Sequence, residues 1–418
     1  MRLKSLPLFL MVAALCGPQA RAQATPEKYT REDASIASAN VLTLSEALKA
    51  AYSLNPQLSA AKNNFGASKG LVEQASLLPN PSLDVSIDDQ QRSTRTTTAM
   101  LSMPIELGGK RRARTEAAQL NSNLAGRDYE IARAEIKTSV MSRFFAVAIA
   151  QETVRVNRDM AEVAAGALRV AQKRVDSGKA APLERNKADI ELTKAQIEVR
   201  QAENELTVAR RELSLLWNEP APKFATVRAE IEDLPPRQTL DELRGALFAS
   251  PRLAAGRLAL EVSKAELNVE KSKRYPDITV SGGLARDNEM GRNKAQLGVS
   301  LPLPIFDRNQ GNVYAATMQT YKAQDTYREL EARLSADLVT AASTYDLALS
   351  SASDYRQSVI PTSQKAYDAA RKGFEAGKVG YLEVLDAQRT LSQGNISYLT
   401  TLSRAASARA EIDRILGQ

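Results

Sequence analysis

The chain carries one long sequence unit twice, and this duplication limits its possible folds more than any other feature. Segments of the first half recur in the same order in the second half, at offsets between 195 and 200 residues. The matched segments are Thr43-Leu44 with Thr239-Leu240, Asn55-Pro56 with Ser250-Pro251, Asn80-Pro81 with Tyr275-Pro276, 176–184 with 375–383, and 209–213 with 408–412. Ordered self-similarity of this kind indicates one structural unit that is used twice. We therefore predict a first unit over 43–219, a linker over 220–237 and a second unit over 238–418.

Each unit contains two short segments with the two-residue period of a β-strand. Residues 82–88 read Ser-Leu-Asp-Val-Ser-Ile-Asp, in which polar and apolar side chains alternate strictly. Alternation of this kind places all apolar side chains on one face of a strand and all polar side chains on the other. We predict an antiparallel hairpin in each unit, with strands over 82–90 and 96–104 in the first and over 277–286 and 294–303 in the second.

Helices account for most of the remaining residues. Each unit opens on a helix, and Thr43, with Glu46 three residues later, is placed to cap the first of them. From Lys110 to about Ser177 the chain has no proline, and its apolar residues step by three and four. On the return helix Leu192, Val199, Leu206 and Leu213 recur every seven residues, which is the spacing of a coiled-coil seam. We predict long helical hairpins over 110–217 and 311–416, the second with a possible interruption at Pro361.

A Pro-Ile dipeptide and nearby glycines stand between each predicted hairpin and the long helix that follows it. Proline has no N–H group to donate and ends a strand ladder, whereas glycine permits the bend that comes next. We interpret both places as junctions where a sheet is followed by a long helix. The predicted junction residues are Pro104, Gly108 and Gly109 in the first unit, and Pro304 and Gly311 in the second.

The first 22 residues have the features of a cleaved secretory signal. Arg2 and Lys4 precede a short apolar run over 6–16, and Ala20-Arg21-Ala22 supplies a small-residue cleavage site. Cys16 leaves lipidation open as an alternative. We expect residues 23–42 to form an extended N-terminal segment. No later apolar run reaches the roughly 18 residues that a membrane-spanning helix requires.

The composition excludes several classes of function. The chain has no histidine and a single cysteine, so Ser/His and Cys/His catalysis have no residues to use. Phosphate-binding loops and dinucleotide fingerprints are also missing, and we expect neither an enzyme nor a cofactor. Apart from Cys16 in the predicted signal, the preferred zinc and cobalt ligands histidine and cysteine are absent, which argues against a resident metal site. The net charge of +7 is modest and its basic residues are interspersed with acids, which argues against nucleic-acid binding.

The strands suggest a membrane barrel that several chains build together. Their predicted length of about 8–11 residues and their alternation suit tilted strands with one lipid-facing and one lumen-facing side. Four strands cannot close a barrel, and unpaired edges are not tolerated in lipid, so the chain must oligomerise. The expected fold is mainly α with a membrane β-barrel part: a trimeric 12-stranded barrel that continues into a periplasmic α-helical barrel. Its lumen-facing residues would include Asp84, Ser86 and Asp88.

Together these features resemble the outer-membrane efflux proteins of the TolC family. The resemblance runs from about Thr43 to the C-terminus, and the tip sequence 377–387, Gly-Lys-Val-Gly-Tyr-Leu-Glu-Val-Leu-Asp-Ala, carries it most clearly. Residues 104–111, Pro-Ile-Glu-Leu-Gly-Gly-Lys-Arg, look like the heavy-metal branch, which serves cobalt–zinc–cadmium and cobalt–nickel resistance pumps. The resemblance implies a homotrimer in the bacterial outer membrane with a periplasmic extension. It also implies a periplasmic adaptor and an RND-type inner-membrane proton/cation antiporter as partners.

The resemblance further implies a periplasmic aperture. Glu383 and Asp386 lie three residues apart on one helix face, where the family places acidic residues that narrow the entrance, and Phe374 belongs to the same aperture. In a trimer each acid would form a ring of three carboxylates that attracts cations. An ordinary solvated helix face would show the same spacing.

The helix tips are the expected docking surface for the adaptor. Glycine is needed there simply to turn the chain, so the structural and functional interpretations agree. The family carries an arginine in the second tip where this chain has Val379. The predicted docking residues are Gly178, Lys179, Gly377 and Lys378.

Two alternative functions remain open from the sequence. A duct of the same type could carry drugs or a secreted protein instead of metal cations. A periplasmic coiled-coil adaptor or scaffold without a pore would explain the long helices but not the two amphipathic hairpins.

Overall fold

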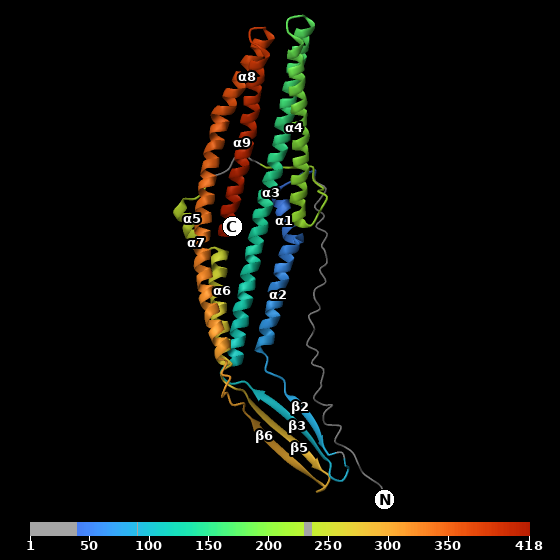
Figure 1. Ribbon diagram of the computed structural model, residues 1–418, viewed down its shortest axis with the longest axis vertical. Coiled ribbons are helices and arrows are strands. Elements are labelled where there is room, and N and C mark those ends of the chain that lie inside the picture. The colour runs from blue at the N-terminus through green and yellow to red at the C-terminus, as the bar shows by residue number, and fades with distance from the viewer. Residues whose placement is uncertain (1–39, 90, 230–235) are drawn as a thin grey trace. The chain divides into compact units, whose positions relative to one another are not determined.

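The computed structural model describes residues 40–89, 91–229 and 236–418, so the predicted signal and most of the segment over 23–42 lie outside the described residues. The first half contains α1 (Leu44–Leu54), α2 (Pro56–Ser76), β2 (Ser82–Asp88), β3 (Thr96–Ile105), α3 (Lys110–Asp176) and α4 (Pro182–Ser214) (Figure 1). The second contains α5 (Leu240–Phe248), α6 (Pro251–Ser272), β5 (Ile278–Asp287), β6 (Arg292–Ser300), α7 (Gln310–Asp354), α8 (Ile360–Glu375) and α9 (Tyr381–Leu416). The same order of elements thus occurs twice, with α7 and α8 together in the place of α3.

The two halves begin with the same local hydrogen bonds. Thr43 caps α1 in a capping box, because its hydroxyl accepts from the N–H of Glu46 and the Glu46 carboxylate accepts from the N–H of Thr43 at 2.8 Å. Thr239 and Glu242 repeat this box at the start of α5. The hydrogen bonds from each threonine lower the pKa of its glutamate. The predicted cap at Thr43 is confirmed.

The four longer strands form one antiparallel sheet in the order β2-β3-β5-β6. One row across the four strands consists of apolar or small residues. Its members, in line across the sheet, are Leu83, Leu101, Gly282 and Leu297. The next row, on the opposite face, contains Asp84, Met100, Gly283 and Gln296. Each half supplies one hairpin, and β3 and β5 join the two hairpins. The outer strands β2 and β6 each have one unpaired edge within the described sheet.

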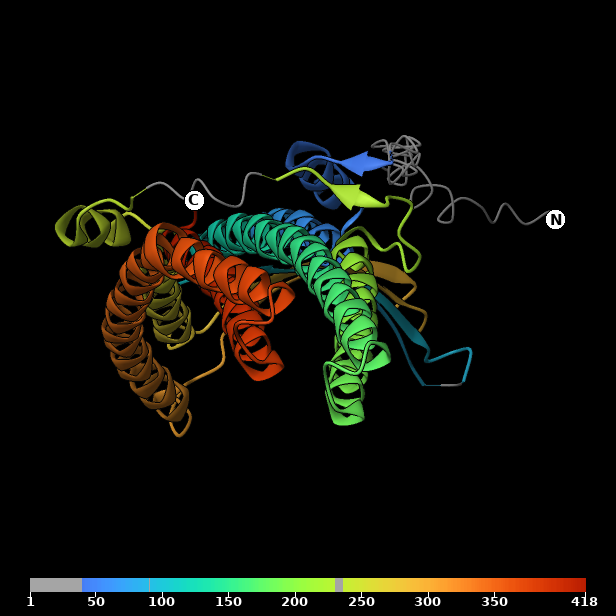
Figure 2. The same ribbon diagram turned by 90° about the horizontal axis from the view of Figure 1, so that it is seen from above.

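The long helices lie side by side in one curved layer (Figure 2). Helix α3 is central, because it contacts α2 and α4 of its own half and α6 and α9 of the other half. Where α7, α9 and α5 meet, Leu338 and Tyr345 of α7 are fully buried against Ile412 and Ile415 of α9. The helical layer therefore has its own apolar core, which is separate from the sheet.

The return helix α4 packs through a seam that is half alanine. Leu206 and Leu213 are buried as the seven-residue spacing predicts, whereas Leu192 and Val199 are half-buried. Buried alanines fill the alternate positions of the repeat, at Ala188, Ala195 and Ala202. Small side chains permit close approach of the helices, which explains why the leucine pattern revealed only part of the seam.

The predicted interruption at Pro361 takes the form of a π-helical turn. The turn covers Tyr355–Val359 and joins α7 to α8 without ending the helix. Pro361 has no N–H for the usual bond to the preceding turn, and a wider turn accommodates this loss. Gly394 of α9 lies opposite, where an added Cβ would be 3.5 Å from the Val359 side chain.

The segment predicted as a linker contributes a short strand. Residues Thr226–Val227 (β4) pair in parallel with Val41–Leu42 (β1). Gln151 of α3 holds this pair on both sides of Val227, with its Oε1 accepting from the Val227 N–H at 2.7 Å and its Nε2 donating to the Val227 carbonyl at 3.2 Å. The sequence does not predict this pairing, because two-residue strands have no detectable period.

Candidate functional site

Both helix tips turn through the same glycine geometry. Gly178 and Gly377 have positive φ values of 68° and 72°. The Lys179 N–H donates to the Arg174 carbonyl, and the Lys378 N–H donates to the Gly373 carbonyl, each at 2.8 Å. This is the pattern of a helix C-terminus closed by a left-handed glycine. The turn leaves both lysine side chains exposed at the ends of the hairpins.

Arg174 ties the tip of the first half to the tip of the second. Its Nη1 donates to the Phe374 carbonyl at 3.0 Å, and its guanidinium lies 4.6 Å from the centre of the Phe374 ring. Its Nε lies 3.2 Å from Oε1 of Glu184, although this pair is misaligned for a hydrogen bond. One side chain from α3 therefore contacts both α4 and α8. No local sequence pattern distinguishes this arginine from the others on α3.

Phe374 lies in the packed interior of the tip. Its side chain is only 2% exposed, and its ring lies 5.8 Å from that of Tyr381. Burial raises the pKa of Tyr381 to about 12, an effect to which Glu191 adds and which Arg389 opposes. Phe374 was predicted to belong to the aperture. The enclosed side chain packs the two halves together, and its aperture role stays a prediction.

Glu383 and Asp386 are both exposed on the first turns of α9. Their neighbours Val384 and Leu385 are buried against the tip core, so the two carboxylates lie on the opposite, solvent-facing side of the helix. Glu383 folds back toward the helix start, where a Cβ added to Gly380 would be 2.9 Å from Glu383 Oε2. The spacing therefore brings both acids to one accessible surface, as expected for residues three apart.

A second cross-link joins α4 to α9 behind the tip. Arg389 donates to Oε1 of Glu191, and Lys194 contacts the same oxygen at 3.1 Å. Burial raises the pKa of Glu191, but the hydrogen bonds from Arg389 and Lys194 outweigh it, and the pKa is lowered overall. In the repeat Arg389 corresponds to Ile190, and Arg174 corresponds to Gly373. Neither arginine has a basic counterpart in the other half, so a comparison of the two halves points to both positions.

The first sheet-to-helix junction is held by two ion pairs. Nζ of Lys110 lies 2.7 Å from Oδ1 of Asp277 in the second half, and Nη1 of Arg114 lies 2.6 Å from Oε1 of Glu106. Gly108 and Gly109 follow with φ values of 68° and 71°, a conformation that glycine adopts without strain.

The first junction also shows where the sheet stops. Pro104 pairs with Thr279 inside β3, beyond the last residue that pairs with β2. The proline thus stands where only one side of the strand needs a partner.

The second junction differs from the prediction. Strand β6 ends at Ser300, so Pro304 lies in the connecting loop and not at the strand end. Gly311 is the second residue of α7, and the residue with positive φ is Asn309, at 57°. Asparagine tolerates this conformation because its side chain can bond locally. Here its Nδ2 donates to the carbonyl of Glu270 at 2.8 Å.

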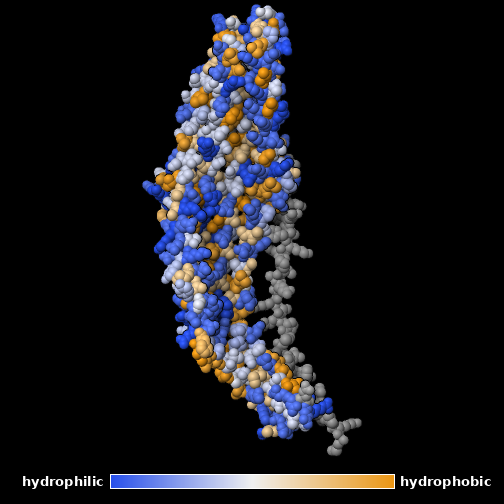
Figure 3. Space-filling view, in the orientation of Figure 1, coloured by the Kyte–Doolittle hydropathy of each residue, from blue (hydrophilic) through white to orange (hydrophobic). Residues whose placement is uncertain are grey.

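The polar face of the sheet contains the predicted lumen residues. Asp84, Ser86 and Asp88 are all exposed on β2, opposite Met100, Thr98 and Thr96. The other face exposes large apolar side chains, with Leu297 at 92%. Figure 3 shows orange atoms along the sheet and at its bend into the helices. A sheet with one wet and one apolar exposed face is the arrangement that a lipid-facing barrel wall requires.

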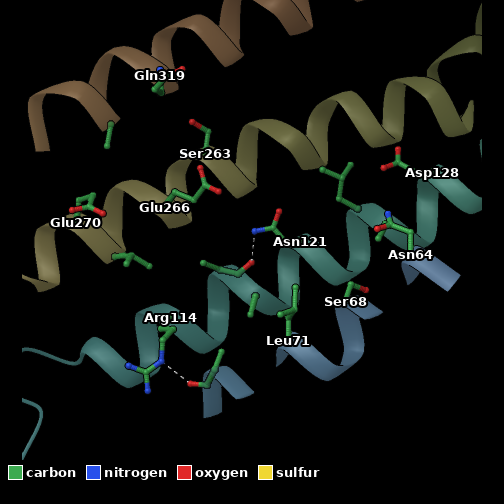
Figure 4. A pocket seen from close by; sticks show the side chains of 17 residues that line it. Asn64, Ser68, Leu71, Arg114, Asn121, Asp128, Ser263, Glu266, Glu270 and Gln319 are labelled. Atoms are coloured by element: carbon green, nitrogen blue, oxygen red, sulfur yellow. Dashed lines mark hydrogen bonds between the residues drawn. The ribbon is translucent and has the colours of Figure 1, made fainter. Parts of the chain in front are cut away.

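A groove of about 790 Å³ with mixed polar and apolar lining runs across the helices near the sheet (Figure 4). It is lined from four helices by side chains that include Asn64, Asn121, Asp128, Glu266 and Gln319. Burial raises the pKa of Asp128. Within 40–89, 91–229 and 236–418, no cluster of three histidine, cysteine or acidic side chains is placed to hold a metal, and no helix is long and apolar enough to cross a membrane.

Comparisons with known proteins agree on one family. Residues 47–219 and 243–418 match the outer membrane efflux protein family, which is one match for each half. The chain is 42% identical over 418 residues to the cobalt-zinc-cadmium resistance protein CzcC of Cupriavidus metallidurans, covering 100% of both. It is 30% identical over 294 residues to the nickel and cobalt resistance protein CnrC of the same species, covering 66% of this chain and 67% of that protein.

The fold has a close counterpart among solved structures. The CusC structure, described as forming a transmembrane channel, superposes with a TM-score of 0.76 at 17% identity, covering 89% of this chain and 91% of that one. The shared fold and the two family matches lead to the same assignment. The chain belongs to the outer membrane efflux protein family.

Proposed function

We propose that this chain is the outer-membrane exit duct of a tripartite, proton-driven efflux system that exports divalent cobalt, zinc, cadmium or nickel. The observation that supports divalent metal as the cargo is the 42% identity with a cobalt-zinc-cadmium resistance protein over the full length of both chains. Family membership supports transport rather than an enzymatic reaction or a non-pore scaffold. The exposed apolar face of the sheet supports insertion in lipid.

The proposed duct is a trimer. Strands β2 and β6 leave unpaired edges, and lipid offers no partner for their backbone groups. Pairing β6 of one copy with β2 of the next removes every edge when three copies close a barrel of twelve strands. The curved helical layer would then continue as one third of a tunnel wall. The protein should have the mass of three chains in mild detergent, and a single-chain mass by analytical ultracentrifugation would contradict closure.

Metal tolerance tests the proposed cargo. Deleting the gene should lower the concentration of cobalt, zinc, cadmium or nickel that arrests growth by about tenfold, because an efflux system without its exit duct delivers no metal outside the cell. Restoring the wild-type gene should restore growth. If the deletion strain keeps normal tolerance to all four metals but loses tolerance to drugs, the duct carries drugs and the metal cargo is wrong.

The tips are the proposed contact with a periplasmic adaptor, which in turn joins an RND-type inner-membrane antiporter. Gly178 and Gly377 shape the turns, and Lys179 and Lys378 are the exposed charges at their ends. Reversing both charges, with Lys179→Glu and Lys378→Glu, should reduce tolerance in the same growth assay while the trimer forms normally. Full metal tolerance in this variant would show that the two lysines are not part of the adaptor contact.

Glu383 and Asp386 are the proposed cation-attracting rings of the aperture. Both carboxylates are exposed on one side of α9, and in a trimer each would be present three times. The variant Glu383→Gln/Asp386→Asn keeps the side-chain shapes and removes six negative charges from three copies. We expect the ratio of cation to anion permeability in planar bilayers to fall about threefold or more. An unchanged permeability ratio would show that Glu383 and Asp386 belong to an ordinary solvated helix face.

A further inference from the structure

The loop between β6 and α7 forms an exposed corner that is both apolar and basic. Leu303, Ile305 and Phe306 are 72%, 62% and 90% exposed. Arg274 and Arg308 line one open hollow together with Pro304, Ile305 and Phe306. We call Leu303, Ile305, Phe306, Arg274 and Arg308 the junction corner. In Figure 3 orange atoms gather at the bend where the helices meet the sheet.

Local hydrogen bonds hold the junction corner in shape. Arg308 donates through its backbone N–H to Oε1 of Gln310 at 2.8 Å and through its Nε to the Pro304 carbonyl at 3.3 Å. Gln310 donates in turn to the Phe306 carbonyl at 3.3 Å, and Asn309 fastens the loop to α6. The loop therefore presents its apolar side chains and the outer nitrogens of Arg308 from a fixed backbone.

The first junction has no equivalent corner. Its cations Lys110 and Arg114 are both paired with acids, at 2.7 and 2.6 Å, and its apolar side chains Ile105 and Leu107 are only 46% and 36% exposed. In the described part of the chain, by contrast, no ion pair joins an acid to Arg274 or Arg308. Asp307 is the one acid of the loop, and its Oδ1 accepts from the Asn309 N–H at 2.8 Å. At the second junction two arginines without an ion pair thus line the same hollow as the exposed side chains of Ile305 and Phe306.

The chemistry of the junction corner matches an anionic phospholipid. The apolar face of β6, with Leu297 and Val299, leads directly into Leu301 and the corner. If the sheet lies in lipid, as the proposed function requires, the corner lies at the helix-side edge of the hydrocarbon, where phosphates begin. Arginine donors fit phosphate oxygens well, and an aromatic ring is suited to the boundary between acyl chains and head groups.

We propose that the junction corner binds an anionic phospholipid, with its phosphate between Arg274 and Arg308 and its acyl chains beside Ile305 and Phe306. The binding surface faces the leaflet on the helix side of the barrel. Three such corners would surround a trimer. Their role would be to fix the depth of the duct in the membrane, because the charged pair and the apolar side chains favour different layers.

Lipid titration of the purified full-length protein in neutral detergent tests this proposal. Native mass spectrometry would measure bound phosphatidylglycerol and phosphatidylcholine of identical acyl chains. We expect the wild type to prefer phosphatidylglycerol. The variant Arg274→Gln/Arg308→Gln should bind it about 30-fold more weakly, since each basic side chain near an anionic surface contributes about fivefold. Asp307→Asn keeps the acceptor for Asn309 and should strengthen binding about fivefold.

A matched variant controls for the loss of charge alone. Arg244→Gln/Arg328→Gln also removes two exposed arginines, from helices outside the corner, and should leave phosphatidylglycerol binding unchanged. The proposal is overturned if the wild type binds both lipids equally, or if this control weakens binding as much as the corner variant. It is also overturned if inorganic phosphate competes with phosphatidylglycerol at equal concentration, because the ligand would then be a free ion.

Two further outcomes separate this proposal from neighbouring explanations. If Arg274→Gln/Arg308→Gln lowers the yield of the three-chain form in lipid-free detergent, the corner is a contact between copies and the lipid proposal is wrong. If the wild type fractionates with the outer membrane but shows no preference for phosphatidylglycerol, only the proposal of lipid binding at the junction corner is overturned. Recovery of the wild type in the soluble periplasmic fraction would overturn the duct itself.

Discussion

A Gly283→Ala substitution is expected to prevent most of the protein from assembling. Gly283 lies on β5 between two paired strands, and a Cβ atom there would be 2.3 Å from the Ala99 carbonyl oxygen and 2.9 Å from Cα of Met100. Both are backbone atoms, so only separation of the strands relieves the overlap. Overpacking of this kind costs about 3 kcal/mol. We expect the amount of protein recovered from outer membranes in the proposed trimeric form, measured by quantitative immunoblotting, to fall about tenfold or more.

The neighbouring glycine supplies the control. A Cβ atom at Gly282 would lie 3.5 Å from Cδ2 of Leu297, which is an ordinary van der Waals contact. Gly282→Ala should therefore give a normal yield, and its reduced freedom in the unfolded chain favours the folded state slightly. The two variants share strand, composition and position in the hairpin. Equal yields from both would show that the close backbone approach at Gly283 does not limit assembly.

Much of the fold follows from local sequence patterns. The alternation of residues 82–88, the capping pair at Thr43 and the glycines at the tips depend on neighbours along the chain, and the structure agrees with each. The duplication adds a global constraint, because a pattern that is weak in one half recurs in the other. Short-range physics and repetition together therefore predict the order of the elements.

Contacts between the two halves lie beyond such patterns. Arg174 is one of several arginines on α3, and only the packed tips bring it over Phe374. The sequence pattern alone does not show that Phe374 is enclosed between the two tips. At the second junction Gly311 was the obvious turn residue, yet Asn309 adopts the left-handed conformation because its side chain can reach Glu270. Such outcomes depend on residues far apart in the sequence.

At the first junction, Gly108→Ala should destabilise the protein by about 3 kcal/mol. Gly108 has a φ of 68°, where a side chain costs about 1–2 kcal/mol. An added Cβ would also lie 2.5 to 2.7 Å from Cδ2, Cβ and Cγ of Tyr275, an overlap worth about 1–3 kcal/mol more. The Cβ atom of Tyr275 cannot turn away, because its position is fixed by the backbone. Urea unfolding of the purified protein, followed by the fluorescence of Trp217, measures the loss.

Gly109→Ala separates the two causes of this loss. Gly109 has nearly the same conformation, with a φ of 71°, but nothing lies within 4 Å of an added Cβ. It should therefore lose only the backbone contribution of about 1–2 kcal/mol. Adding Tyr275→Ala to Gly108→Ala deletes Cγ and Cδ2 but keeps the Cβ at 2.6 Å, so it should remove the part of the overlap that comes from the ring. The double variant should therefore lose less than the sum of the single losses. Strict additivity, or equal losses at the two glycines, would mean that the ring of Tyr275 does not fix the angle at which the sheet meets α3.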